Sequence, residues 1–178
     1  MNVIARVFHA AYNEAVKPKT YVKGDEFEDF LRRVIFPASC YDLVSKTHDY
    51  SANRRDYIES SMAPDYRFRE RTSGQEFYVE AKYRSGFYRR GVDWCQQYQL
   101  QRYLEIDMTT PVLIAIGVGG RAPAPDHVFL FPVRGVRYTH LFPSFLRHYE
   151  IPCDCLPADR SRQLLTEVCD EDISPVTA

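Results

Sequence analysis

The feature that most restricts the fold of this chain is the run Glu76–Arg84, in which two kinds of side chain alternate without interruption. One set is Phe77, Val79, Ala81 and Tyr83, and the other is Tyr78, Glu80, Lys82 and Arg84. A period of two places these sets on opposite faces of a β-strand. The segment 64–69 also alternates, and a turn signal at 72–75 separates it from the first run. The sequence therefore predicts an antiparallel hairpin.

Around this hairpin, predicted helices and strands are interleaved. Apolar spacing predicts helices over 1–16, 24–36, 92–106 and 143–150, and strands over 41–44, 111–116 and, as the last strand, 128–133. Pro37 ends the second helix because proline has no amide hydrogen and clashes with the preceding turn. Such an order predicts an α/β protein with a mixed β-sheet flanked by helices on both faces.

Length and charge restrict the organisation of the chain. Its 178 residues suit a single domain, with a core at about 23–133, the N-terminal helix 1–16 and a C-terminal extension 134–178 that ends in an acidic tail. Lys and Arg number 23 and Asp and Glu 24, so a basic coat over the whole surface is excluded. The longest apolar run, 111–118, is too short to span a bilayer. No signal peptide pattern is present, and we expect a cytoplasmic protein without membrane association.

The five cysteines favour free thiols over a disulfide framework. Cys153 and Cys155, with Cys169 and either Cys40 or Cys95, are residue types that bind zinc or iron–sulfur clusters. Their spacing matches neither kind of motif, so we expect no such site.

The chemistry is concentrated on the hairpin. Glu80 and Lys82 are two residues apart on one strand and therefore share a face. Asp65 begins the partner strand and can reach the same end of that face. Two converging carboxylates suit a hard cation such as Mg²⁺, and a neighbouring lysine can position and help to deprotonate a metal-bound water. The alternative is a surface hairpin with charges on its solvated face.

Two predicted helices contribute further polar groups. Glu28 lies at the edge of the apolar stripe of its helix, and a carboxylate turned toward the sheet is costly unless it is paired or bound to a cation. Gln99 and Tyr103 are four residues apart and share one helix face. The alternative for Glu28 is an ordinary charge on an amphipathic helix. The alternative for Gln99 is a solvated helix face that is rich in glutamine.

Together these residues resemble the PD-(D/E)XK nuclease superfamily, which has the restriction-endonuclease-like fold. The resemblance covers about residues 23–133. It consists of Pro64-Asp65, Glu80-Ala81-Lys82, an upstream Gly24-x-x-Phe27-Glu28 and a downstream Gln99-Leu100-x-x-Tyr103, which looks like the Q-x-x-x-Y motif of the RecB-like branch.

The resemblance implies a role for each residue. Asp65 and Glu80 would bind Mg²⁺ or Mn²⁺, the Ala81 carbonyl would be a further ligand, and Glu28 would complete the site directly or through water. Lys82 would orient the nucleophilic water. In addition, Gln99 would support Lys82 or a phosphate, and Tyr103 would brace its helix or touch the nucleic-acid backbone.

The loop 85–91 interleaves arginines with aromatic residues. Arginine neutralises phosphates, and Tyr or Phe stacks on unpaired bases. The alternative is a solvated loop whose rings pack on the core. The candidate nucleic-acid contacts are Arg67, Arg84, Tyr88, Arg89, Arg90, Arg102 and Tyr103.

The sequence therefore predicts a metal-dependent nuclease that hydrolyses DNA phosphodiester bonds. We expect an endonuclease with structure selectivity or weak sequence selectivity, acting as a homodimer or within a larger nucleic-acid-processing complex. Three alternatives stay open: a non-catalytic nucleic-acid-binding or assembly protein on the same fold, a Holliday junction resolvase, and an RNA-cutting relative.

Overall fold

The predicted hairpin lies at the centre of the molecule. The computed structural model describes residues 19–47 and 63–169, so the expected helix 1–16 and the end of the acidic tail lie outside the described residues. β2 (Tyr66–Glu70) pairs antiparallel with β3 (Glu76–Arg84). The bounds of β3 are those that the alternation predicts.

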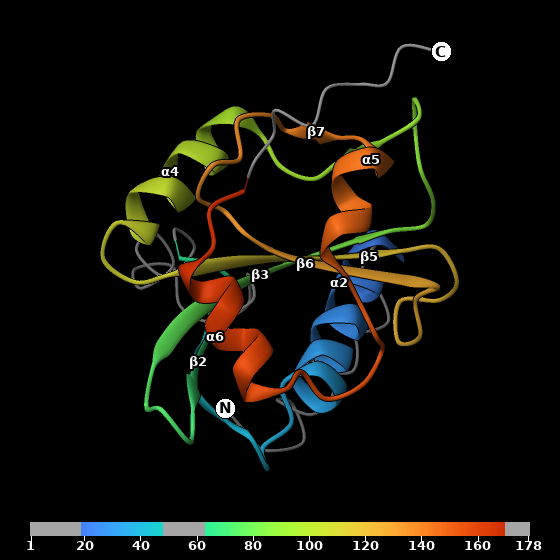
Figure 1. Ribbon diagram of the computed structural model, residues 1–178. Helices are drawn as coiled ribbons and strands as arrows, with labels where there is room; N and C mark the ends of the chain where they lie inside the picture. The colour runs from blue at the N-terminus through green and yellow to red at the C-terminus, as the bar shows by residue number, and fades with distance from the viewer. Residues whose placement is uncertain (1–18, 48–62, 170–178) are drawn as a thin grey trace, which may run out of the picture.

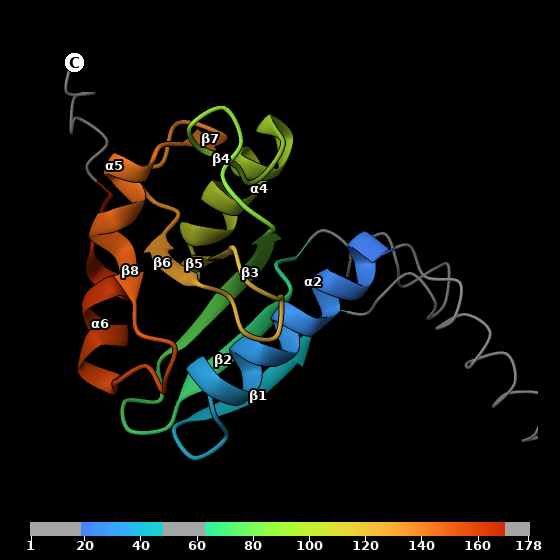
Figure 2. The same cartoon turned by 90° about the vertical axis from the view of Figure 1, so that its right-hand side faces the viewer.

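Four further strands extend the hairpin into a six-stranded mixed sheet of order β1-β2-β3-β5-β6-β8 (Figures 1 and 2). β1 (Tyr41–Lys46) pairs antiparallel with β2, and β5 (Val112–Val118) runs parallel to β3. β6 (His127–Pro132) and β8 (Glu150–Ile151) continue the sheet in antiparallel pairs. Every residue of β5 is buried, as expected for a central strand that is covered on both faces.

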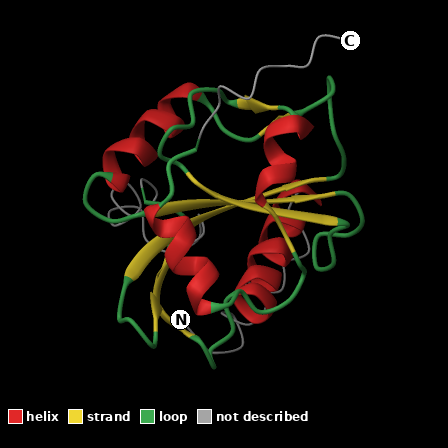
Figure 3. Cartoon of the chain, in the orientation of Figure 1, coloured by secondary structure: helices red, strands yellow, loops and turns green. Residues whose placement is uncertain are grey.

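Helices cover both faces of the sheet, as the fold-class prediction requires. α2 and the π-helical turn η1 lie on one side, and α4, α5 and α6 lie on the other (Figures 2 and 3). The bounds are α2 Lys19–Phe30, η1 Leu31–Ile35, α4 Gln97–Asp107, α5 Pro143–Leu146 with the 3₁₀ turn η2 Arg147–Tyr149, and α6 Ala158–Thr166. No described helix has the length and apolar character needed to cross a membrane.

Aromatic side chains hold the hairpin against α2 and η1. Phe36, which follows η1, stacks on Phe68 of β2 at a ring separation of 4.8 Å and meets Tyr41 edge-on at 5.2 Å. On the opposite face, Trp94 packs on Tyr103 and Phe131. The two faces of the sheet are therefore anchored independently, which fixes the orientation of the side chains of β3.

The helix predicted over 92–106 begins later than expected. Val92–Asp93 instead forms β4, which pairs with β7 (His140–Leu141). Gln96 and Gln99 exchange side-chain and backbone hydrogen bonds in a capping box, and this box sets the first turn of α4.

The predicted strand 128–133 is not the last strand, because β7 and β8 follow it. The acidic tail also contains α6, whose Leu164 and Leu165 are buried. The segment after residue 133 is therefore part of the sheet and of the core.

Candidate active site

The open end of β3 positions Asp65. Pairing between β2 and β3 ends at Tyr66 and Val79, and within the described residues the remainder of β3 pairs only with β5. Asp65 lies directly before β2, and its Oδ2 accepts the Ala81 N–H at 2.8 Å. The Asp65 carboxylate thus accepts the hydrogen bond that a carbonyl of a neighbouring strand would otherwise accept. This contact places the carboxylate beside residues 80–82 of β3.

Glu80 is the most enclosed carboxylate of the site. Its side chain is 3% exposed and forms an ion pair with Lys82 Nζ, whose side chain is 22% exposed. Burial and the charge of Glu80 raise the pKa of the Tyr103 hydroxyl, which approaches Glu80 from α4. A buried carboxylate is destabilising without such partners. These contacts hold Glu80 and Lys82 side by side.

Glu28 approaches from α2. Its Oε2 lies 3.0 Å from Lys46 Nζ on β1. Burial raises the pKa of Glu28, and the negative charges of Asp25 and Glu80 add to the rise, although Lys46 opposes it. The charge of Glu28 in turn contributes to the raised pKa of Asp65. The three carboxylates Glu28, Asp65 and Glu80 therefore share one electrostatic environment.

The electrostatics of the site favour binding of a cation. Burial raises the pKa of Asp65 well above its ordinary range, and Glu80 and Glu28 add to this, against the opposing effects of Lys82 and the Ala81 amide. Burial alone would lower the pKa of Lys82, but Glu80 and Asp65 outweigh it and the net shift is upward. Lys82 therefore stays charged, yet one lysine does not relieve the repulsion among three carboxylates.

The donor set fits Mg²⁺ or Mn²⁺ in chemical type. Within residues 19–47 and 63–169, no three His, Cys, Asp or Glu side chains are grouped closely enough to hold a metal ion by themselves. Mg²⁺ commonly retains several waters and uses only one or two protein carboxylates with substrate phosphates. Asp65 and Glu80 with the Ala81 carbonyl meet that requirement, and Glu28 lies within their electrostatic reach.

Gln99, Arg102 and Tyr103 lie on α4 with distinct partners. Gln99 Oε1 accepts the Gln96 N–H at 2.9 Å, so this oxygen caps the helix. The Arg102 guanidinium lies over the Tyr103 ring at 5.4 Å. Tyr103 is buried and stacks on Trp94, and the role that the resemblance implies for it stays a prediction. The role of Gln99 at the site stays a prediction.

Two of the predicted nucleic-acid contacts are held by the protein itself. Arg67 pairs with Glu76 at 2.7 Å and lies over the Tyr78 ring. Arg84 donates from Nε to the Asp93 carbonyl at 2.7 Å, and burial lowers its pKa. Arg84 thereby ties the end of β3 to the chain that returns toward α4.

The tip of the loop after β3 is exposed. Tyr88 and Gly91 exchange backbone hydrogen bonds of 2.8 and 2.9 Å around a two-residue turn. The turn residues Arg89 and Arg90 have φ values of 48° and 62°, the left-handed conformation that such turns require and that few residues other than glycine adopt. Arg89 also lies over the exposed ring of Tyr88 at 5.2 Å. The turn therefore presents two arginines to solvent.

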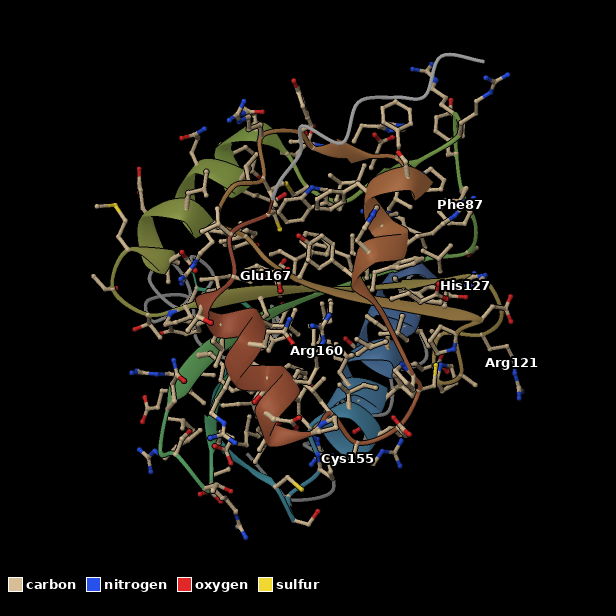
Figure 4. All side chains as sticks on the ribbon, viewed as in Figure 1. Phe87, Arg121, His127, Cys155, Arg160 and Glu167 are labelled. Atoms are coloured by element: carbon tan, nitrogen blue, oxygen red, sulfur yellow. The ribbon has the colours of Figure 1, made fainter. Side chains whose placement is uncertain are left out.

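The structure adds residues that the sequence analysis did not select. The Cys95 thiol lies near Lys82 and Glu80, and burial is the main cause that raises its pKa to about 12. Phe142, which is 53% exposed, directly follows β7 and so lies beside β4 and the loop tip. Phe87 projects at the outer edge of the same loop (Figure 4). No sequence pattern identifies Cys95 or Phe142, because their positions depend on the pairing of β4 with β7.

Comparison with known proteins finds a similarity in structure. The chain matches no protein-family model and no curated protein. Among solved structures, it is similar to Hjc of Archaeoglobus fulgidus, a Holliday junction resolvase from an archaeal hyperthermophile. The TM-score is 0.49 at 9% sequence identity, over 78% of this chain and 97% of that one. A similarity at this level concerns the arrangement of elements and says nothing about chemistry.

Proposed function

We propose that this protein is a metal-dependent nuclease that hydrolyses phosphodiester bonds in DNA. The observation that carries the proposal is the placement of Asp65 and Glu80 with Lys82 at the open end of β3, while Glu28 on α2 lies within their electrostatic reach. Hydrolysis of a phosphodiester needs a cation site, a means of orienting water and an electrostatic partner for the developing charge. These four side chains supply each of them.

The roles of the side chains follow from their positions. Asp65, Glu80 and the Ala81 carbonyl would hold Mg²⁺ or Mn²⁺, and Glu28 would act directly or through water. When bound, the metal supplies Lewis-acid polarisation of a phosphate oxygen. Lys82 keeps its charge beside Glu80 and donates hydrogen bonds that orient a water molecule. Tyr103, whose hydroxyl approaches Glu80, would help to position this carboxylate.

The surface next to the site is suited to DNA. The exposed tip of the loop after β3 carries Arg89 and Arg90, which can neutralise phosphates. The Tyr88 ring is 60% exposed, and Phe87 and Phe142 are also exposed, so unpaired bases have rings on which to stack. Lys23 Nζ donates to Ser85 Oγ at 3.0 Å and links this loop to α2, which carries Glu28. We propose that this surface guides DNA to the carboxylates; a homodimer would allow both strands to be cut.

Cleavage of defined DNA substrates tests the proposal. The full chain would be given supercoiled plasmid, single-stranded DNA and branched DNA, each with Mg²⁺, Mn²⁺ or EDTA. We expect metal-dependent cutting that Glu80→Gln lowers by about 100-fold or more, because this change removes the charge of a metal ligand while keeping the size and polarity of the side chain. Glu105→Gln, on the exposed side of α4, is the matched control and should cut normally.

The second candidate function is a non-catalytic nucleic-acid-binding protein on the same fold. It is favoured by the ion pair between Lys82 and the buried Glu80, which compensates the charge of this carboxylate without a metal. The same preparation separates the two functions. DNA binding without cutting, together with no heat of Mn²⁺ binding in calorimetry, would support the non-catalytic protein and refute the nuclease.

A further inference from the structure

Two cysteines far apart in the sequence meet on the surface away from the carboxylates. The Sγ atoms of Cys40 and Cys155 are 3.6 Å apart. Cys40 directly precedes β1, and Cys155 lies in the segment between β8 and α6. Both are free thiols, and Cys155 is exposed at the surface (Figure 4). This distance is van der Waals contact between two sulfur atoms.

Hydrogen bonds next to each cysteine keep the two segments together. The Tyr41 hydroxyl donates to the Leu156 carbonyl at 2.9 Å, and the Leu156 N–H donates to the Ile35 carbonyl at 2.9 Å. Tyr41 and Leu156 are buried. The residue after each cysteine is therefore fixed in the core, so the approach of the thiols does not depend on a mobile surface contact.

We propose that Cys40 and Cys155 are a site of reversible disulfide formation. The oxidant is a small-molecule disulfide such as oxidised glutathione. The exposed Cys155, as its thiolate, attacks one sulfur of the oxidant, which breaks the S–S bond and releases one thiol after protonation. The Cys40 thiolate then attacks the Cys155 sulfur and releases the second thiol. The oxidant gains two electrons and the two thiol protons, and the protein gains one S–S bond.

The geometry needed for the bond is close to the one present. A disulfide has an S–S length of about 2.0 Å, so the sulfur atoms must approach further by rotation of the two side chains. The other thiols lie elsewhere: the Cys153 thiol faces the Pro125 carbonyl at 3.9 Å, the Cys169 thiol donates to the Pro132 carbonyl at 3.0 Å, and Cys95 lies near Lys82. The pairing is therefore specific for Cys40 and Cys155.

The test is thiol labelling after oxidation. The full chain would be incubated with oxidised glutathione, alkylated, digested and analysed by mass spectrometry, with and without prior dithiothreitol. We expect a peptide pair cross-linked through Cys40 and Cys155 that dithiothreitol releases. Cys153→Ser is the matched control and should form the same cross-link, whereas Cys40→Ser and Cys155→Ser should not.

A stability measurement provides a second readout. Closing a loop of more than a hundred residues restricts the unfolded chain, so the oxidised protein should melt at least about 5 °C higher than the reduced protein. The increase should be absent in Cys155→Ser. Glutathione that stays attached to Cys155, cross-links between two chains, or full alkylation of both cysteines after oxidation would each overturn the proposal. None of these results depends on nuclease activity.

Discussion

Asp65 combines a structural hydrogen bond with an electrostatic penalty. Its Oδ2 accepts the Ala81 N–H, while burial and the charges of Glu80 and Glu28 raise its pKa. A carboxyl whose pKa is raised on folding binds more protons in the folded state. Stability is therefore lost as pH rises from the ordinary pKa of 3.8 toward the raised value. At neutral pH without metal, ionised Asp65 opposes folding.

At the residue scale, Asp65→Asn should stabilise the metal-free protein and abolish cleavage. The amide oxygen still accepts the Ala81 N–H, and the melting temperature in EDTA at pH 7 should rise by about 2–4 °C for each kcal/mol of repulsion removed. This increase in melting temperature should disappear below pH 3.8, where Asp65 is protonated and therefore as neutral as the asparagine that replaces it. Thermal melts across pH, with the exposed Asp154→Asn as control, measure this. A lower melting temperature at pH 7 would show that the charge itself stabilises the fold.

At the element scale, the predictable features were those with a regular period. The alternation of residues 76–84 fixed β3 and placed Glu80 and Lys82 on one face. The predicted start of α4 was wrong, because the two-residue strand Val92–Asp93 is too short to show a period. Its partner strand, His140–Leu141, is also remote in the sequence. For the same reason the Lys46 partner of Glu28 and the position of Cys95 were not predictable. They depend on how separate elements pack.

The turn after β3 leads to the element-scale prediction. Replacing both Arg89 and Arg90 by Gln should weaken DNA binding and reduce the slope of log K against log salt by roughly 1.4–1.8, since two phosphate contacts are lost. The double Lys variant keeps both charges and should keep the slope, and Arg162→Gln on α6 should leave binding unchanged. Fluorescence anisotropy over a salt series measures the slopes. Equal slopes for the Gln variant and the parent would show that this turn is not part of the DNA-binding surface.

At the scale of the whole molecule, the C-terminal segment is linked to the helix that braces Glu80. The Cys169 N–H donates to the Arg134 carbonyl at 2.9 Å. The guanidinium of Arg134 forms an ion pair with Asp107 at the end of α4, at 3.0 Å. Asp107 also accepts the Val112 N–H at the start of β5. These contacts join the predicted C-terminal extension to α4 and β5, as far as Cys169, the last residue that the structure describes.

Gly135 makes this link possible. Its φ is +89°, and a Cβ there would lie 2.2 Å from the Cys169 carbonyl oxygen. Gly135→Ala combines left-handed strain with displacement of the C-terminal segment, and should lower the free energy of unfolding by about 3 kcal/mol or more. Gly74→Ala is the matched control: its φ is +71° with nothing within 4 Å of the added carbon, so strain alone should cost about 1 kcal/mol.

Urea unfolding measures both changes, and alkylation of the native protein gives an independent readout. The buried Cys169 thiol should react faster in Gly135→Ala, because the segment that carries it has moved, and at the parental rate in Gly74→Ala. Equal destabilisation of the two variants with unchanged alkylation would mean that backbone strain accounts for the whole effect. The C-terminal segment would then be only loosely coupled to the sheet. Faster alkylation confined to Gly135→Ala would show that packing from residue 134 onward belongs to the same cooperative unit as the candidate active site.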